Sequence, residues 1–369
     1  MIIRGWFAFA MIAVATAAPE RPEMIADFAW FSSLGLPDAN GLKFVHYTYG
    51  WSGGRAETAK PMWNYGWLVD ENENDFSVRT VDFGIEKLNR KGRAEKHAWD
   101  DHSFEPADFQ QYLEEELKPR YLTEHTVGQP EREPKTVLST ADVHHGVRGR
   151  PHLGRLGQLF TLSWICSRQG ADEIADRLYG AAQNLPGAKL PFHQKLEAEI
   201  GKFEIWRITV DFGDLSITRR QLFSRLEPFA QQFPASPEVT RATEMADELK
   251  KMIAEDDAHP VLTKEQIGAL PTAEQAKEWI FQLRDEYAVQ TDESGSVHFL
   301  RPSNHRDSPA HQLQVLGEAA VPALTAALDD QRLTRSVHYG RDWDFVFSYE
   351  VLRVGDAAHQ ILREIHGVN

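Results

Sequence analysis

The residues best suited to metal chemistry are the fifteen histidines, which gather most densely between residues 142 and 152. There the run Asp142-Val-His144-His145-Gly146 is followed by His152. A zinc site on a helix needs ligands on one face, as in H-x-x-x-H or H-E-x-x-H, and neither pattern occurs in the chain. We therefore interpret this group as a solvated loop, and we predict no metal ion and no cofactor.

A second pattern resembles the start of a calcium loop. Asp70, Asn72 and Asn74 have the spacing of the first three ligands of an EF-hand. Such a loop then needs glycine at its sixth position and glutamate at its twelfth, where this chain has Asp75 and Val81. Because predicted strands flank the acidic hexapeptide, the pattern favours a hairpin turn.

Signatures of hydrolases and nucleotide-binding enzymes are missing from the sequence. It contains no G-x-S-x-G elbow and no P-loop, and Trp51-Ser-Gly-Gly54 is not a dinucleotide fingerprint. A catalytic pair of carboxylates, as in glycosidases, remains an alternative, but the sequence singles out no acidic residue for it. His193 with Glu197, and His97 with Asp101, have i,i+4 spacing, which predicts surface pairs worth about 0.2–0.5 kcal/mol each.

The aromatic residues of the N-terminal region are the candidates for ligand binding. They could form a stacking platform for sugars or peptides, or they could fill the core of a small module, and the core is the interpretation we favour. The candidate ligand-binding side chains are Tyr49, Trp51, Trp63 and Trp67, with Tyr47 and Tyr65 beside them.

These aromatics belong to a segment whose pattern is that of strands. Residues 67–69 and 76–83 have β-branched and aromatic enrichment, which predicts a hairpin across the acidic turn. From Phe104 onward the periodicity becomes helical, and we expect Ser103 to cap a helix that starts near Pro106. Residues 126–149 indicate a linker or an exposed loop.

Apolar periodicity then predicts a series of helices. A break at Gly170 and small residues at close-packing positions make the first two of them resemble tetratricopeptide-like repeats. The single cysteine, Cys166, lies in an apolar helical run and is expected to be a core residue. The predicted helices span residues 153–168, 171–185, 192–211, 218–233, 237–254 and 272–287.

Charge and the N-terminus limit the class of protein. The chain has 55 acidic and 40 basic side chains, a net charge of −15, which argues against a nucleic-acid binder and against attachment to anionic lipid. Arg4, an apolar run over residues 5–14 and the small residues 15–18 are typical of a secretory signal peptide. We therefore expect export to the periplasm or the exterior, with no integral membrane span after cleavage.

Near the C-terminus, residues 309–330 predict two short antiparallel helices with Gly317 at the turn. Leu316-Gly-Glu-Ala-Ala-Val-Pro-Ala-Leu-Thr-Ala-Ala-Leu-Asp-Asp330 resembles the second half of a HEAT-type repeat of the phycocyanobilin-lyase-like kind, as found in exported bacterial helical-repeat proteins. Residues 354–367 resemble the first helix of a following repeat. The connection between them is long, and we expect it to be stapled by ion pairs of Arg335, Arg341 and Arg353 with Asp342, Asp344 and Asp356.

These observations predict a mainly α-helical repeat array, an α-α superhelix, with a small β-rich N-terminal module. The resemblance implies a non-catalytic scaffold whose partner is another protein. A sugar- or peptide-binding module and a secreted hydrolase with an unrecognised carboxylate site are the alternatives. The expected parts are a signal peptide (1–18), the β-rich module (20–93), a helix and linker (94–150), a helical repeat-like region (151–258) and a helical region with the HEAT-like unit (259–369).

Overall fold

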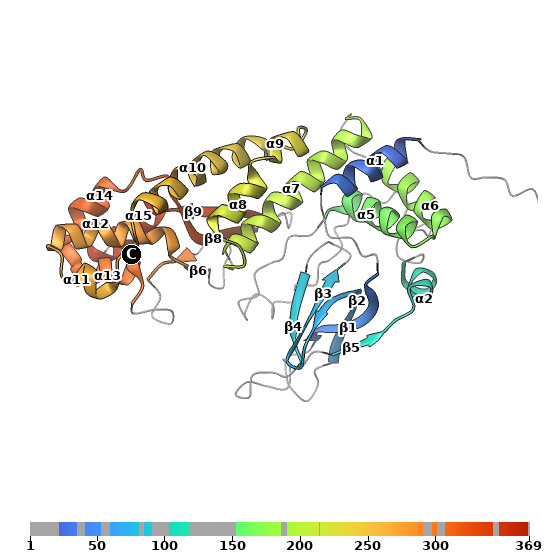
Figure 1. Ribbon diagram of the computed structural model, residues 1–369, viewed down its shortest axis with the longest axis horizontal. Helices are drawn as coiled ribbons and strands as arrows, with labels where there is room; N and C mark the ends of the chain where they lie inside the picture. The colour runs from blue at the N-terminus through green and yellow to red at the C-terminus, as the bar shows by residue number, and fades with distance from the viewer. Residues whose placement is uncertain are drawn as a thin grey trace, which may run out of the picture. The chain divides into compact units, whose positions relative to one another are not determined.

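The computed structural model describes most of the chain, and its described part is mainly helical with a small antiparallel sheet near the N-terminus (Figure 1). The chain divides into two units, residues 1–37 and 38–369. Helix α1 (Pro22–Ser33) lies in the first unit and all other described elements lie in the second. The described residues are 22–34, 41–52, 60–80, 85–90, 103–117, 153–185, 190–213, 215–290, 297–300, 307–341 and 347–367.

The N-terminal sheet has five antiparallel strands in the order β4-β3-β2-β1-β5. One side of the central strands is closed by buried side chains, among them Val45, Tyr47, Phe76 and Val78. The predicted hairpin across the acidic turn is present as β2 and β3. The strands are β1 (Lys43–Ser52), β2 (Lys60–Glu71), β3 (Asp75–Thr80), β4 (Ile85–Asn89) and β5 (Phe104–Pro106).

The expected start of a helix at Ser103 is wrong. Ser103 instead exchanges hydrogen bonds with Thr48 of β1, and the three residues that follow it form β5 along the same strand. The helix begins at Phe109 because the Asp108 carboxylate accepts a hydrogen bond from the Gln110 amide at 2.8 Å. Helix α2 (Phe109–Tyr112) continues into a π-helical turn, Leu113–Leu117.

The next helices agree closely with the apolar periodicity. Gly170, at a φ of +76°, separates the first two of them as predicted. The expected helix over residues 218–233 is divided in two at Pro228, whose ring and missing N–H interrupt a helix. The elements are α5 (Arg155–Arg168), α6 (Asp172–Gln183), α7 (Phe192–Gly213), α8 (Arg219–Leu226), α9 (Phe229–Gln232) and α10 (Val239–Ala258).

The C-terminal region contains the predicted helical pair with a glycine turn. Helices α13 (Pro309–Leu316) and α14 (Val321–Ala326) are joined through a 3-10 turn, η5 (Gly317–Ala319), where Gly317 has a φ of +56°. Before them come α11 (Lys264–Gly268), α12 (Thr272–Gln282), the 3-10 turn η4 (Leu283–Asp285), and the short strands β6 (Val289–Gln290) and β7 (Val297–His298).

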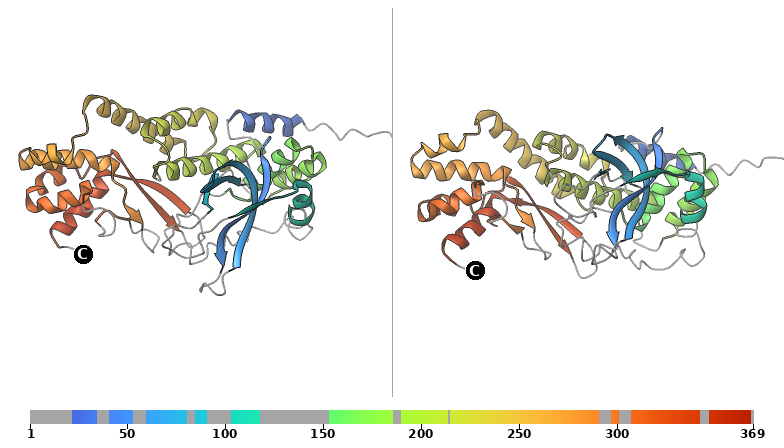
Figure 2. Two further views of the ribbon diagram at one scale, coloured as in Figure 1. Left: turned by 60° about the horizontal axis from the view of Figure 1, so that its bottom comes forward. Right: turned by 90° about the horizontal axis from the view of Figure 1, so that it is seen from below.

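A β-hairpin stands where the sequence predicted only a long connection between repeats. Strands β8 (Leu333–Arg341) and β9 (Phe347–Arg353) pair antiparallel and lead into α15 (Val354–Ile365), as both views in Figure 2 show. Helix α15 begins at the predicted residue 354 and ends at Ile365, two residues before the predicted end, and Ala358 and Ile361 pack into the same core as α12, α13 and α14. A stacked array of repeats therefore remains a prediction.

Two further expectations concern the membrane and export. Among the residues that the structure describes, no helix is both long enough and apolar enough to cross a bilayer. The predicted signal peptide lies outside the described residues.

Candidate functional site

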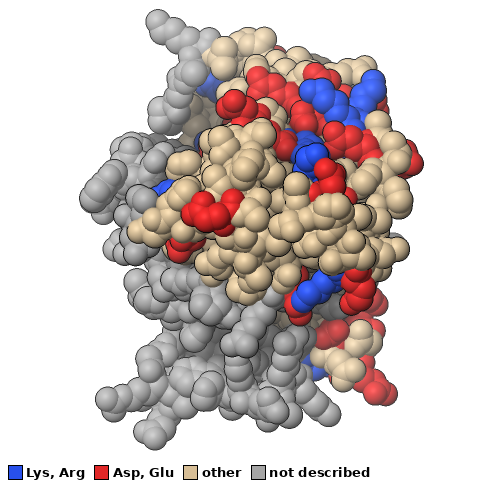
Figure 3. All heavy atoms as spheres, turned by 90° about the vertical axis from the view of Figure 1, so that its left-hand side faces the viewer, with Lys and Arg blue, Asp and Glu red and all other residues tan. Residues whose placement is uncertain are grey.

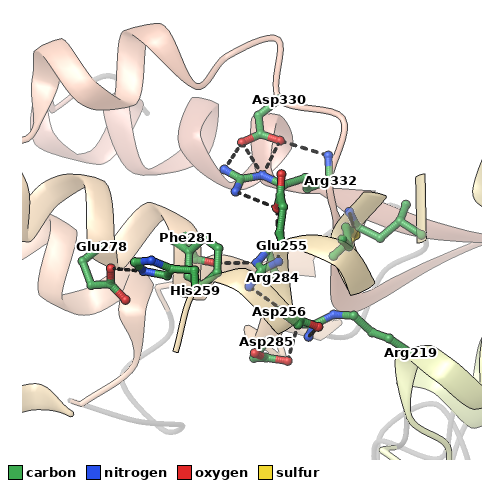
Figure 4. A network of polar contacts seen from close by, with 12 residues as sticks. Arg219, Glu255, Asp256, His259, Glu278, Phe281, Arg284, Asp285, Asp330 and Arg332 are labelled. Atoms are coloured by element: carbon green, nitrogen blue, oxygen red, sulfur yellow. Dashed lines mark hydrogen bonds and ion pairs between the residues drawn. The ribbon is translucent and has the colours of Figure 1, made fainter. Parts of the chain in front are cut away.

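The most concentrated set of interacting charged side chains in the described residues lies where α8, α10, η4 and β8 meet (Figure 4). It joins the helices before residue 258 to the C-terminal region. We call it the arginine network, and it comprises Arg219, Arg284, Arg332 and Arg335 with Glu255, Asp256, Asp285 and Asp330.

Arg284 is the centre of the network. Its side chain is only 1% exposed, and one face of its guanidinium lies 3.6 Å from the centroid of the Phe281 ring. The guanidinium pairs with Asp256 at 2.8 Å and with Glu255 at 3.3 Å, and its Nε donates to the Phe281 carbonyl. Burial lowers the pKa of Arg284, and the nearby Arg219 and Arg332 lower it further, while Asp256 and Glu255 oppose them.

Arg219 connects the first residue of α8 to this centre. It pairs with Asp256 at 2.9 Å and with Asp285 at 2.5 Å, so its planar guanidinium binds two carboxylates from different elements. Asp256 also pairs with Arg284, which makes it the bridge between the two arginines. The Nε atom of Arg219 is buried and has no hydrogen-bond partner.

Arg332 closes the network on the side of the hairpin. It makes a bidentate contact with Asp330, in which the NH2–Oδ2 distance is 2.5 Å, and its NH1 lies 3.4 Å from Glu255. Burial by itself would lower the pKa of Arg332, but the bonds from Asp330 and Glu255 outweigh it and raise the pKa. The turn after α14 is thereby tied to the end of α10.

Arg335 differs from the sequence-based expectation. It was expected to pair with aspartates in its own connection, but its NH1 donates to the carbonyls of Phe212 and Ile217, at the end of α7 and just after it. Its guanidinium lies 4.1 Å from the Phe212 ring centroid, and its Nε is 3.9 Å from Asp285. Burial lowers the pKa of Arg335, with Arg219 adding to the effect.

The other ion pairs expected in this connection are either replaced by another contact or lie outside the described residues. The Asp356 carboxylate accepts from the Arg353 amide at 2.8 Å, which caps α15 instead of forming an ion pair with the guanidinium. The side chain of Arg341, and residues 342–346 with Asp342 and Asp344, lie outside the described part.

A histidine and a glutamate extend the network at its edge. The His259 Nε2 lies 2.8 Å from the Glu278 carboxylate, and the imidazole meets the Phe281 ring edge-on, with ring centroids 4.4 Å apart (Figure 4). Phe281 therefore contacts both the His259 ring and the Arg284 guanidinium. A partly buried aromatic ring and a neighbouring cation of this kind stabilise each other.

The arrangement is suited to holding elements together. Four positive charges face four negative charges in the described set, so the network is balanced and offers no excess charge to a ligand. Arginine stays protonated at neutral pH and does not act as a general base. We therefore interpret the arginine network as a structural joint.

The aromatic residues singled out from the sequence lie on the N-terminal sheet. Trp67 is 2% exposed and its ring packs against Phe44 at 5.2 Å and Phe109 at 6.1 Å, so it lies in the interior, as the favoured interpretation has it. The backbones of Tyr49 and Trp51 lie in β1 and that of Trp63 in β2, while their side chains are outside the described part.

The remaining sequence candidates are also placed, or lie outside the description. His193 and Glu197 form the predicted i,i+4 pair at 3.0 Å, but the pair is not on the surface as expected, because Glu197 is buried. The oxygen of Asn72 accepts from the amides of Asn74 and Asp75, which is the geometry of a turn. No group of three metal-ligating side chains is found among the described residues. His97, Asp101, the Asp142–Gly146 run and His152 are not among the described residues.

The arginine network itself was missed by the sequence analysis. Its residues are separated by as many as 116 positions, from Arg219 to Arg335, and no local pattern connects them. The chain matches no family model, no curated protein and no solved structure.

Proposed function

We propose that the protein is an exported, non-catalytic scaffold, which uses stacked helical pairs to bind another protein. The observation that carries the proposal is the α13–α14 pair. It buries Leu313 and Leu324 in a core shared with α12 and α15, while Val315 on the outer side of α13 is 68% exposed. A helical pair with apolar side chains on both sides can pack against a further surface.

The outer face of this region is poor in charge. On the face that the α11–α14 end presents in Figure 3, uncharged side chains cover most of the centre, an acidic patch interrupts it on the left, and the largest group of charged side chains lies at the upper right. Leu328, just after α14, is 39% exposed and Val261, just before α11, is 61% exposed. Protein interfaces have centres depleted in charged residues, and the mostly uncharged centre of this face agrees with that composition.

The arginine network supports the same proposal. It holds α8, α10, η4 and the hairpin in one arrangement through side chains that are already paired with one another. A joint of this kind keeps a binding surface preorganised, so less conformational entropy is lost when a partner binds.

Site-specific photocrosslinking in the producing cell tests the proposal. A photoreactive residue replaces Val315, and a matched variant carries it at Thr243, which is exposed on α10. We expect one discrete crosslinked product from position 315 and none from position 243. Val315→Glu should abolish association with the identified partner without changing the folded state.

Two results would contradict the scaffold function. One is diffuse labelling that is the same from both positions. The other is turnover of a substrate by the purified chain together with the absence of any crosslinked product in the cell.

A further inference from the structure

Glu286 is a buried carboxylic acid in the joint between η4 and β8. It follows η4 directly and is 5% exposed. Its backbone carbonyl accepts from the Ser336 hydroxyl at 2.9 Å and from the Arg335 amide at 3.1 Å. Two residues later, the Ala288 amide donates to the same Ser336 hydroxyl at 2.8 Å. The main chain around Glu286 is therefore attached to β8.

The side chain of Glu286 reaches a different element. Its carboxylate accepts from the Ala310 amide at 3.2 Å and from the hydroxyl of Ser308, the residue that caps α13. Ser308 also accepts from the His311 amide, so its hydroxyl connects Glu286 to the first turn of the helix. One carboxyl group thus links the η4–β8 joint to the N-terminus of α13.

The charged side chains nearest to this link form their ion pairs with residues other than Glu286. On its own segment, Arg284 pairs with Asp256 and Glu255, and Asp285 pairs with Arg219. The facing side chains of α15 are apolar, namely Ala357, Ala358 and Ile361. On β8, Arg335 donates to Phe212 and Ile217, and His338 is the other titratable side chain described. On α12, Lys277 pairs with Glu274, and Glu278 pairs with His259. The remaining titratable or charged groups are His311 of α13 and Asp356, His359, Arg363 and Glu364 of α15.

Burial without a paired cation makes the ionised form of this carboxyl unfavourable. Desolvation raises the pKa of Glu286 to about 7, although its bonds from Ala310 and Ser308 act in the opposite direction. A glutamate released to solvent ionises well below that value. The packed arrangement therefore binds a proton more tightly than an opened one does.

We propose that Glu286 is a proton-controlled latch, which holds the N-terminus of α13 to the η4–β8 joint when protonated and loosens it when ionised. The proposal concerns the coupling of α13 to the joint and is independent of the scaffold function.

The direction and size of the effect follow from proton linkage. Because the closed form has the higher pKa, its advantage is complete below the ordinary pKa of glutamate and declines as the pH rises toward 7. The opening constant of α13 then increases about tenfold per pH unit across that interval. Between about pH 5.5 and about pH 8.5, the expected increase is roughly thirtyfold.

Amide hydrogen exchange of the full chain measures this opening. We expect the protection of residues 310–316, corrected for intrinsic exchange, to fall roughly thirtyfold over that pH range in the wild type. Glu286→Gln keeps an oxygen acceptor but cannot ionise, so its protection should not change with pH. Glu248→Gln, at another glutamate that is 8% exposed, and His311→Gln should both keep the wild-type profile.

The wild type provides a second measurement that needs no variant. A titration of the Glu286 side-chain carboxyl by carbon NMR should have its midpoint well above that of an ordinary glutamate. An ordinary midpoint, or protection in α13 that does not change with pH in the wild type, would overturn the proposal. A Glu286→Gln variant that keeps the full pH dependence would also overturn it.

Discussion

Replacing Arg284 by methionine tests whether the arginine network holds the protein together. Methionine retains much of the apolar length of arginine, so the change removes mainly the charge and the hydrogen bonds. The lost contacts are those to Asp256 at 2.8 Å, to Glu255 at 3.3 Å and to the Phe281 carbonyl at 2.8 Å, together with the stacking on Phe281.

The size of the loss depends on what remains around the vacated position. Breaking a buried ion pair by removing one partner costs about 3–5 kcal/mol. Here Asp256 keeps Arg219 and Glu255 keeps Arg332, and the two carboxylate side chains are 29% and 42% exposed. Partial solvation reduces the penalty, so we expect a loss of roughly 3 kcal/mol in the free energy of unfolding.

Urea denaturation followed by circular dichroism is the assay, with two matched variants. Lys277→Met removes an exposed i,i+3 pair with Glu274 and should cost at most about 1 kcal/mol, with a smaller loss at high salt. Arg284→Lys keeps the charge but loses the planar fork, so lysine should recover less than half of the stability.

The reasoning would be refuted by a loss for Arg284→Met no greater than that for Lys277→Met. Full recovery by lysine would also refute it, because a single point charge would then be sufficient. The loss at Arg284 should persist at high salt, since a side chain with 1% exposure is poorly screened.

Three other changes have clear expected outcomes. Gly355→Ala places a methyl group 2.5 Å from the Leu328 carbonyl and should cost about 1–3 kcal/mol, whereas Gly268→Ala meets open space and should gain up to about 1 kcal/mol; equal effects in urea denaturation would contradict this packing. Burial raises the pKa of Cys166 to about 12, so a thiol reagent should modify it only as the protein unfolds, and rapid labelling of the native chain would argue against that burial. Asn72→Ala removes the acceptor of two turn amides and should lower the unfolding free energy by about 1 kcal/mol; a thermal melt that does not change would contradict the turn.

Local chemistry made many of the helices predictable. Their apolar positions repeat with the period of a helix, and a turn forms wherever glycine can take a positive φ at low cost, as at Gly170 and Gly317. The acidic hairpin turn was predictable for a similar reason, because Asn72 completes it with its own side chain. These features depend on residues close to one another in the chain.

The strands near residue 104 and the β8–β9 hairpin were not predicted. Phe104–Pro106 is too short for a period of two to appear, and it is extended because β1 offers it a partner. Residues 332–353 were predicted only as a long connection between repeats. Cross-strand pairing, which the sequence does not contain as a local signal, determined both cases.

The sequence by itself determined where most of the longer helices lie and which of their positions are buried, because both follow from contacts within a few turns of chain. Only the tertiary structure decided which charges meet. Arg335 was expected to pair within its own connection, yet it reaches Phe212 and Ile217 more than a hundred residues earlier. Glu286 became a candidate latch only because folding placed it between β8 and α13. Ion pairing and desolvation depend on distance in space, so separation along the chain does not reveal them.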